Sequence, residues 1–346
     1  MERARRSLGS RWTVSRSLGA RYLGPLAACL VVASLGCGGG DGGGGGDASD
    51  TLQILTLTDT EPSRPVADGE LDVDPLGRGN LVGTQTPVIF IHGFDFPLGG
   101  RSPKQQMDDI IADLTQRVAN WGNRYQAWLY LYDPLKDLAD SADELAGELR
   151  RLRHQGNVIL VGYSQGGLVA RSFDTRFGDE FPVSRLIMIA TPNSGLPLDA
   201  MKAMLLDDID RLPDPLPTTF LREVARTIYR EVFTEREVSD DLREGSEFLA
   251  SLAPPKDYYY AIAGVGSDAN IFLDYVSNLD LYNGLPNDGL VSVESVEAGL
   301  VAGRTAELGP EGGYPDKSHF SIIRTDMVFE AVAGLLQAGS EGAIIL

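Results

Sequence analysis

The chain has 346 residues, 43% of them hydrophobic, and a formal net charge of −19. This length and composition allow a large core, organised as one domain with extensions rather than as two domains. The acidic balance excludes a general affinity for nucleic acid, because the phosphate backbone would be repelled.

Residues 1–36 have the pattern of an export signal. Residues 1–21 hold six arginines and a single acid, whereas residues 22–36 carry no charge. A basic head followed by a short apolar stretch predicts a signal peptide, and a short membrane anchor is the alternative. Removal of this segment leaves 24 of the 30 basic and 48 of the 49 acidic residues, which gives the mature chain a net charge of −24.

The signal ends in "ASLGC", which resembles the lipobox of bacterial lipoproteins, with Cys37 as the lipidated residue. Residues 37–50 are rich in glycine and predict a flexible tether. We therefore expect an exported cell-envelope lipoprotein bound to a membrane through Cys37, with plain secretion as the alternative. The other cysteine, Cys29, lies in the signal, so the mature chain should contain no internal disulfide and no cysteine-ligated metal.

Strands and helices alternate after an N-terminal extension at residues 51–84, which holds one candidate strand at 51–58. Apolar runs predict strands at 87–93, 125–133, 157–163, 184–192 and 258–264. Helical spacing of apolar residues predicts helices along 110–121, 138–152, 165–177 and 327–336. This order predicts an α/β domain over residues 85–346, with a mostly parallel central sheet and helices on both faces.

Residues 196–254 form a long insertion between two predicted strands. Apolar residues recur there at helical spacing, for example Leu221, Val224 and Ile228. One interpretation is a helical lid or cap over a site, with an apolar face that meets lipid. The alternative, which the sequence favours equally, is a set of ordinary helices packed against the body.

The stretch "GYSQG" places Ser164 at a predicted strand-to-helix turn. Ligands bind at the carboxyl ends of the strands in parallel sheets, so the hydroxyl of Ser164 would lie at the functional edge. The flanking Gly162 and Gly166 would allow strand and helix to approach closely around a strained backbone. This is the G-x-S-x-G nucleophile elbow, and the backbone N–H of Gln165 would face the same space.

A serine nucleophile needs a base to take its proton, and the chain has three histidines. His154 lies at the charged end of a predicted helix, where a solvated role suits it. His92 ends the first core strand in "IFIHGF", where the N–H groups that follow it should matter more than its imidazole. His319, in a predicted loop before the last helix, is therefore the expected base.

The base needs a carboxylate partner, and Asp288 in "LPNDGLVSVES" is the preferred candidate. Asp316, three residues before the histidine, is the competitor. The weaker candidates are Asp268, Asp274 and Asp280. An oxyanion hole also needs two N–H donors, for which we predict Gln165 and a residue of the loop after the first strand, either Phe94 or Gly93.

Four stretches in this order resemble bacterial lipases and serine esterases of the α/β-hydrolase superfamily: "PVIFIHGF", "ILVGYSQGGLVAR", "IATPNSGLP" and "NDGLVSVES…SHF". The resemblance implies hydrolysis of lipid-type carboxylic esters through an acyl-enzyme. Ser164 would be the nucleophile, His319 the base and Asp288 its orienting acid, and the reaction would need no metal or organic cofactor. Some relatives hold a structural calcium, and the acidic loops around 268–288 leave that open.

Two other functions remain open at this stage. The same residues resemble those of phospholipid acyltransferases and PGAP-like serine esterases, so transfer of the acyl group to an alcohol is an alternative. A binding lipoprotein that keeps the fold without turnover is the other. The presence of all three triad candidates and of the elbow glycines argues against that second alternative.

Overall fold

The computed structural model describes residues 69–75, 84–94, 102–203, 237–266, 282, 284–301, 305–306 and 317–338. The chain divides into two units, residues 1–56 and 57–346, and every described residue belongs to the second. The predicted signal, Cys37, the tether and the candidate strand at 51–58 therefore lie outside the described residues.

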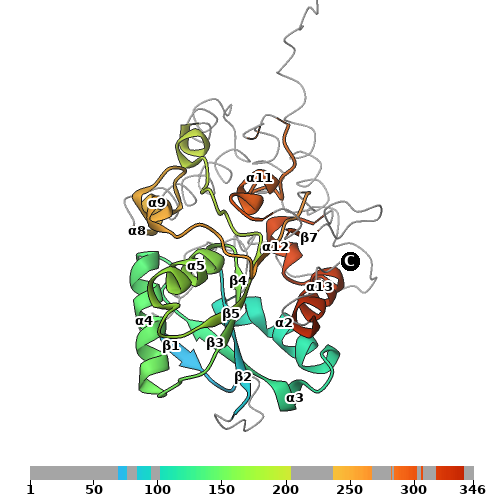
Figure 1. Ribbon diagram of the computed structural model, residues 1–346. Coiled ribbons are helices and arrows are strands. Elements are labelled where there is room, and N and C mark those ends of the chain that lie inside the picture. Colours follow the sequence, from blue (N-terminus) through green and yellow to red (C-terminus); the bar gives the residue numbers. More distant parts are fainter. Residues whose placement is uncertain are drawn as a thin grey trace, which may run out of the picture. The chain divides into compact units, whose positions relative to one another are not determined.

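The described residues form one seven-stranded sheet in the order β1-β3-β2-β4-β5-β6-β7 (Figure 1). Neighbouring strands are parallel except β1, which is antiparallel to β3. The strands are β1 Glu70–Asp72, β2 Thr86–Ile91, β3 Tyr125–Leu131, β4 Val158–Tyr163, β5 Val183–Ile189, β6 Tyr259–Ile262 and β7 Thr305–Ala306. The mostly parallel sheet is confirmed, and it begins earlier than residue 85 because β1 lies in the predicted extension.

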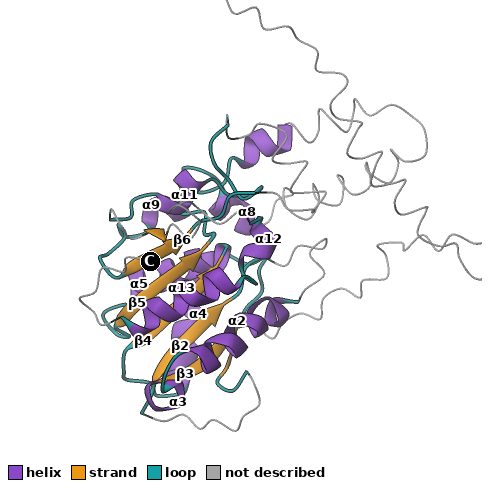
Figure 2. Ribbon diagram, turned by 90° about the vertical axis from the view of Figure 1, so that its right-hand side faces the viewer, coloured by secondary structure: helices purple, strands orange, loops and turns teal. Residues whose placement is uncertain are grey.

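Helices cover both faces of this sheet. Those described are α2 Pro103–Arg117, α3 Trp121–Arg124, α4 Leu138–Arg151, α5 Gln165–Phe177, α8 Glu237–Leu242, α9 Glu247–Ser251, α11 Val293–Glu297, α12 His319–Ile322 and α13 Asp326–Gln337. In Figure 1, α4 and α5 lie on one side of the strands and α2 and α13 on the other. Figure 2 looks onto the face that α2 and α13 cover.

The central strands β2, β3, β4 and β5 are mostly apolar because both of their faces are buried. In β2, Ile89 and Ile91 belong to the hydrophobic cluster that contains α4 and α5, whereas Val88 and Phe90 belong to the cluster with α2 and α13. All four side chains are 0% exposed. Complete burial of such a side chain contributes roughly 1.5–3 kcal/mol to the stability of the fold. The buried core therefore stabilises the strands whose carboxyl ends carry the site.

The helix predicted at 110–121 begins and ends earlier than the apolar pattern suggested, since α2 spans Pro103–Arg117. α2 ends at Arg117, and Val118 already has extended backbone angles. Asn120 adopts a left-handed conformation (φ 56°), after which Trp121 begins the short helix α3. Val118 and Trp121 are nevertheless buried in the same cluster as α2, which explains why the apolar spacing continued past the end of the helix.

The insertion at 196–254 is described only at its two ends, since residues 204–236 lie outside the described residues. The described ends pack on the body: Phe248 and Leu252 belong to the cluster that contains α5. A carboxylate oxygen of Asp241 accepts a hydrogen bond from the backbone N–H of Leu138 at 2.8 Å, at the start of α4. Across the described parts of the chain, no helix has the length and apolar character needed to cross a membrane.

Candidate active site

Ser164 lies at a sharp turn between β4 and α5. Its backbone angles are φ 53° and ψ −129°, a strained conformation for a residue with a side chain. Small neighbours make the turn possible: a Cβ on Gly162 would be 2.5 Å from the Cα of Gly167, and a Cβ on Gly166 would be 2.3 Å from the carbonyl oxygen of Ile91. The predicted close approach of strand and helix is confirmed, and Ser164 is 8% exposed.

His319 lies next to this serine although 155 residues separate them in the chain. Its Nε2 is 2.9 Å from Ser164 Oγ. His319 is 1% exposed, and it is the first residue of α12. The loop predicted before the last helix therefore contains a short helix. Tyr163 holds the base in place, because its hydroxyl donates to the His319 carbonyl at 2.6 Å.

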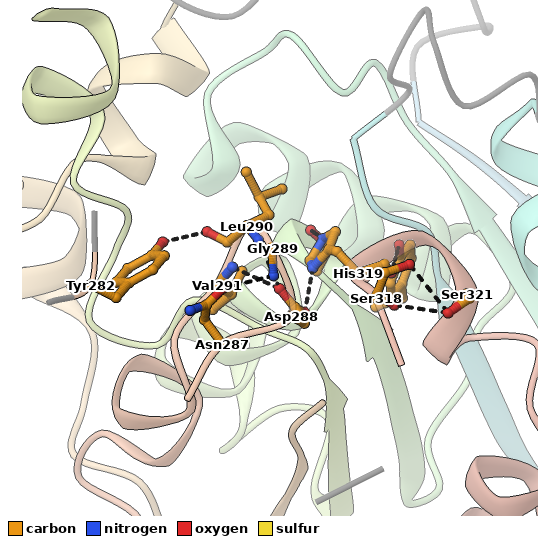
Figure 3. Close-up of polar contacts among 11 residues, drawn as sticks. Tyr282, Asn287, Asp288, Gly289, Leu290, Val291, Ser318, His319 and Ser321 are labelled. Carbon is orange, nitrogen blue, oxygen red and sulfur yellow. Dashed lines mark hydrogen bonds and ion pairs between the residues drawn. The ribbon is translucent and has the colours of Figure 1, made fainter. Parts of the chain in front are cut away.

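Asp288 contacts the opposite nitrogen of the same imidazole. Its Oδ2 is 2.8 Å from His319 Nδ1, and the two residues are also joined by a backbone bond from His319 N–H to the Asp288 carbonyl. The other carboxylate oxygen accepts backbone N–H groups of Leu290 at 3.0 Å and Val291 at 2.7 Å (Figure 3). These bonds orient the carboxylate toward Nδ1 and require Nδ1 to carry a proton, which leaves Nε2 as an acceptor for the serine hydroxyl.

Asp316, Asp268, Asp274 and Asp280 lie outside the described residues, and so does most of the acidic stretch at 268–288. Within the described residues, no group of three or more His, Cys, Asp or Glu side chains could hold a metal ion. The expected calcium option therefore stays a prediction.

The two remaining histidines make other contacts and do not act as the base. His154 follows α4, and its Nε2 contacts the carbonyl of Gly156 at 2.9 Å. His92 is fully buried, and burial lowers its pKa to about 4, so the ring is neutral near pH 7. Its Nε2 accepts the backbone N–H of Tyr132 at 3.3 Å, and its Nδ1 contacts the Gly93 carbonyl at 2.8 Å. The imidazole thus has a structural role that the sequence analysis missed.

The loop after β2 lies directly against the nucleophile. A Cβ on Gly93 would be 2.9 Å from that of Ser164. The N–H of Gly93 already donates to Gln106 Oε1 at 3.1 Å, and Gln106 Nε2 donates to the Phe94 carbonyl at 3.3 Å. The Gly93 N–H is therefore already engaged within the fold, and Phe94 stays the predicted donor of this loop.

The other predicted donor is the backbone N–H of Gln165, the first residue of α5. It makes no hydrogen bond with the described residues, because no intrahelical carbonyl precedes it. Its side chain is nearly fully buried, and Nε2 donates to the Tyr132 hydroxyl and to the Pro134 carbonyl, each at 3.1 Å. The residue is thus rigidly held, while its N–H remains available at a helix N-terminus.

The "TPNSG" segment after β5 braces the Asp288 side of the site. Asn193 Nδ2 donates to the Val296 carbonyl of α11 at 2.7 Å, and its Oδ1 accepts from Arg171 of α5 at 3.0 Å. Ser295, also in α11, donates from its hydroxyl to the Gly195 carbonyl at 2.9 Å. Since α11 follows the Asp288 turn, these bonds tie that turn to the helix that carries the nucleophile.

A central parallel strand leads through a strained serine into a helix, and acid and base then follow in the chain order Ser, Asp, His. The fold is that of an α/β-hydrolase. A family model described as Palmitoyl protein thioesterase matches residues 87–252, slightly less than half of the chain. This match covers Ser164 but neither Asp288 nor His319, and it supports a hydrolase of the thioesterase type. Among curated proteins, none matches this sequence.

Three solved structures are similar to the chain at low identity. Bacillus licheniformis lipase BlEst2 in its mature form is 22% identical with a TM-score of 0.46, and the match covers 78% of this chain and 98% of the lipase. A thermophilic esterase from Thermogutta terrifontis is 15% identical with a TM-score of 0.40, covering 78% and 92%. Phospholipase PlaB from Legionella pneumophila is 20% identical with a TM-score of 0.41, covering 61% and 45%.

Proposed function

We propose that the protein is a serine hydrolase that cleaves lipid-type carboxylic esters through an acyl-enzyme. One observation carries the proposal: a single buried imidazole bridges the hydroxyl of Ser164 at 2.9 Å and the carboxylate of Asp288 at 2.8 Å. Nucleophile, base and orienting acid are thus within hydrogen-bond reach of one another, as general-base activation of a serine requires.

The first half-reaction acylates the serine. Ser164 Oγ attacks the ester carbonyl carbon while His319 Nε2 takes the hydroxyl proton. Asp288 accepts the hydrogen bond from Nδ1 and stabilises the imidazolium that forms. The oxyanion accepts hydrogen bonds from the backbone N–H groups of Gln165 and Phe94, and each such donor is worth about 3–4 kcal/mol in the transition state.

Collapse of this tetrahedral intermediate breaks the bond between the carbonyl carbon and the leaving oxygen. His319 returns its proton to that oxygen, and the alcohol departs. A water molecule then attacks the acyl carbon while His319 takes its proton. The bond from this carbon to Ser164 Oγ breaks, His319 returns the proton to Oγ, and the carboxylic acid departs. The proposed cycle uses no metal and no organic cofactor.

Thioester cleavage is a second candidate activity, favoured by the thioesterase family model that matches residues 87–252. The same triad suits it, because a thiolate leaves more easily than an alkoxide and the oxyanion is the same. Transfer of the acyl group to an alcohol instead of water is a third outcome on this site, and it differs only in the acceptor.

We also propose that the enzyme works in the cell envelope, exported by residues 1–36 and held to a membrane by a lipid on Cys37. The "ASLGC" pattern and the glycine-rich stretch after it support this placement. A tethered catalytic domain would meet ester substrates at the lipid surface.

The activity is tested with Ser164→Ala and a matched control, Ser172→Ala, which changes a buried serine within α5. We expect the first variant to lose hydrolysis of p-nitrophenyl butyrate by a factor on the order of 10⁵–10⁶ and the second to retain it. Acyl chains from acetyl to palmitoyl, as oxygen esters and thioesters, then define the substrate class. Product analysis with and without an added alcohol separates hydrolysis from transfer. A Ser164→Ala variant with most of its activity would refute the proposal.

A further inference from the structure

The two proposed oxyanion donors come from separate parts of the fold. Gln165 begins α5 after β4, whereas Phe94 lies in the loop after β2. Both N–H groups must point at one carbonyl oxygen, and an error of a few tenths of an ångström in their spacing weakens the bond that forms in the transition state. Something in the fold has to set that spacing.

The hydroxyl of Tyr132 connects the two segments. Tyr132 is the first residue after β3, and it is 0% exposed. It contacts both the loop after β2 and the first residue of α5. Its hydroxyl donates to the His92 carbonyl at 2.9 Å and accepts from Gln165 Nε2 at 3.1 Å. One buried hydroxyl thus donates a hydrogen bond to the loop after β2 and accepts one from the residue after the nucleophile.

Further contacts fix Tyr132 against the loop. Its ring stacks on the imidazole of His92 with centroids 4.4 Å apart and planes 20° apart. Its backbone N–H donates to His92 Nε2, and the opposite ring nitrogen contacts the Gly93 carbonyl at 2.8 Å. Tyrosine and histidine are therefore joined by two hydrogen bonds and a stacked face, so a shift of one displaces the other.

We propose that Tyr132 is a positioning residue that sets the distance between the two oxyanion donors through its hydroxyl, by holding the Gln165 side chain to the His92 carbonyl. The inference rests on the proposed function. The Tyr132 hydroxyl would contribute to transition-state stabilisation through Gln165 and His92, without touching the substrate itself.

The test compares Tyr132→Phe with Tyr130→Phe. Tyr130 lies two residues earlier, is equally buried, stacks on Tyr132 with centroids 5.5 Å apart, and donates its hydroxyl to the Ser141 carbonyl at 2.7 Å, away from the site. Each variant loses one buried phenolic hydrogen-bond donor and keeps its ring, so both should lose similar stability. Only Tyr132→Phe should lower kcat for p-nitrophenyl butyrate, by a factor on the order of 10 to 100, with KM nearly unchanged.

The affinity for a transition-state analogue separates a positioning role from a purely structural one, because a purely structural role would leave this affinity unchanged. A trifluoromethyl ketone forms a hemiketal oxyanion on the serine, so its inhibition constant should rise in Tyr132→Phe by the same factor by which kcat/KM falls. Gln165→Met breaks the same contact from the other side and should reproduce the loss if Tyr132→Phe does not fold. The losses in the double variant should be less than additive, because the bond between the Tyr132 hydroxyl and Gln165 Nε2 is removed by either substitution alone.

The inference and the proposed function fail separately. Loss of activity in Ser164→Ala together with wild-type kcat and analogue affinity in both Tyr132→Phe and Gln165→Met would overturn the inference alone. A raised KM with unchanged kcat would also overturn it, because the tyrosine would then act in substrate binding. Equal losses of kcat in Tyr132→Phe and Tyr130→Phe would indicate a general destabilisation around β3. That result would also overturn the inference.

Discussion

Asp288 and His319 are joined twice, once through their side chains at 2.8 Å and once through their backbones, where the His319 N–H donates to the Asp288 carbonyl at 2.8 Å. The backbone bond fixes the separation of the Asp288 turn and the start of α12 independently of the side-chain contact. The Asp288 turn is itself closed by a bond from its N–H to the Val291 carbonyl. Base and acid are therefore held as one unit beside the nucleophile.

Asp288→Asn should lower kcat by a factor on the order of 10³–10⁴ without unfolding the protein. The amide oxygen can keep the two N–H groups of Leu290 and Val291, which turns the NH₂ group toward His319 Nδ1. That contact requires Nδ1 without a proton, so Nε2 carries the proton and can no longer accept one from Ser164. Asp316→Asn is the matched variant and should stay near wild type in steady-state hydrolysis. Collapse of the rate only in Asp316→Asn would assign the acid to that residue.

The elbow offers a paired stability test. Gly166→Ala places a methyl group 2.3 Å from the Ile91 carbonyl oxygen and 2.4 Å from that of His92, both rigid backbone atoms. We expect a loss of about 3 kcal/mol or more in the free energy of unfolding, measured with urea. Gly147→Ala, in the exposed part of α4 with nothing within 4 Å, should instead gain about 0.5–1 kcal/mol. Equal effects at the two glycines would contradict the packing described for the elbow.

The buried His92 predicts a specific loss of stability in acid. Its pKa in the folded protein is about 4, against 6.5 when exposed. Between these values the unfolded chain binds the extra proton, so the free energy of unfolding falls as pH decreases through this window and levels off below pH 4. Relative to His92→Asn, the wild type should lose about 2 kcal/mol more between pH 7.5 and pH 5. Parallel pH profiles for the two proteins would show that His92 is not buried as a neutral ring.

Much of the fold was predictable because burial on both faces leaves a strong mark on sequence. The runs that became β2, β4 and β5 are mostly apolar, and the elbow glycines lie at the junction of β4 and α5. Ser164 was expected at the carboxyl end of a parallel strand, and His319 was expected from a comparison of the three histidines. Asp288 was expected from its turn after a predicted strand, and the structure brings the three side chains together.

Other features leave little local signal. β1 has only three residues, two of them acidic, and its place in the sheet depends on pairing with β3. The clamp made by Gln106 and the bridge made by Tyr132 arise from contacts between segments 12 to 40 residues apart. Glutamine and tyrosine carry no motif at those positions. Their roles follow from neighbours that only the folded chain supplies.

The proposed lipid anchor is tested by Cys37→Ser in the full chain. Loss of the thiol removes the site of lipidation, so the variant should move from the detergent phase to the aqueous phase in a Triton X-114 partition. Hydrolysis of soluble p-nitrophenyl esters should be unchanged, because residue 37 lies in a segment outside the catalytic domain. A variant that stays in the detergent phase would argue against lipidation and in favour of another membrane contact.

The most direct measurement of the central claim is covalent labelling with a fluorophosphonate, mapped by mass spectrometry. We expect one modified residue, Ser164, with no labelling in Ser164→Ala. Labelling should be strongly slowed in His319→Gln and unchanged in His154→Gln, a histidine whose ring contacts Gly156 away from the site. A label on another residue, or equal rates for the two histidine variants, would contradict the account of His319 as the base that activates Ser164.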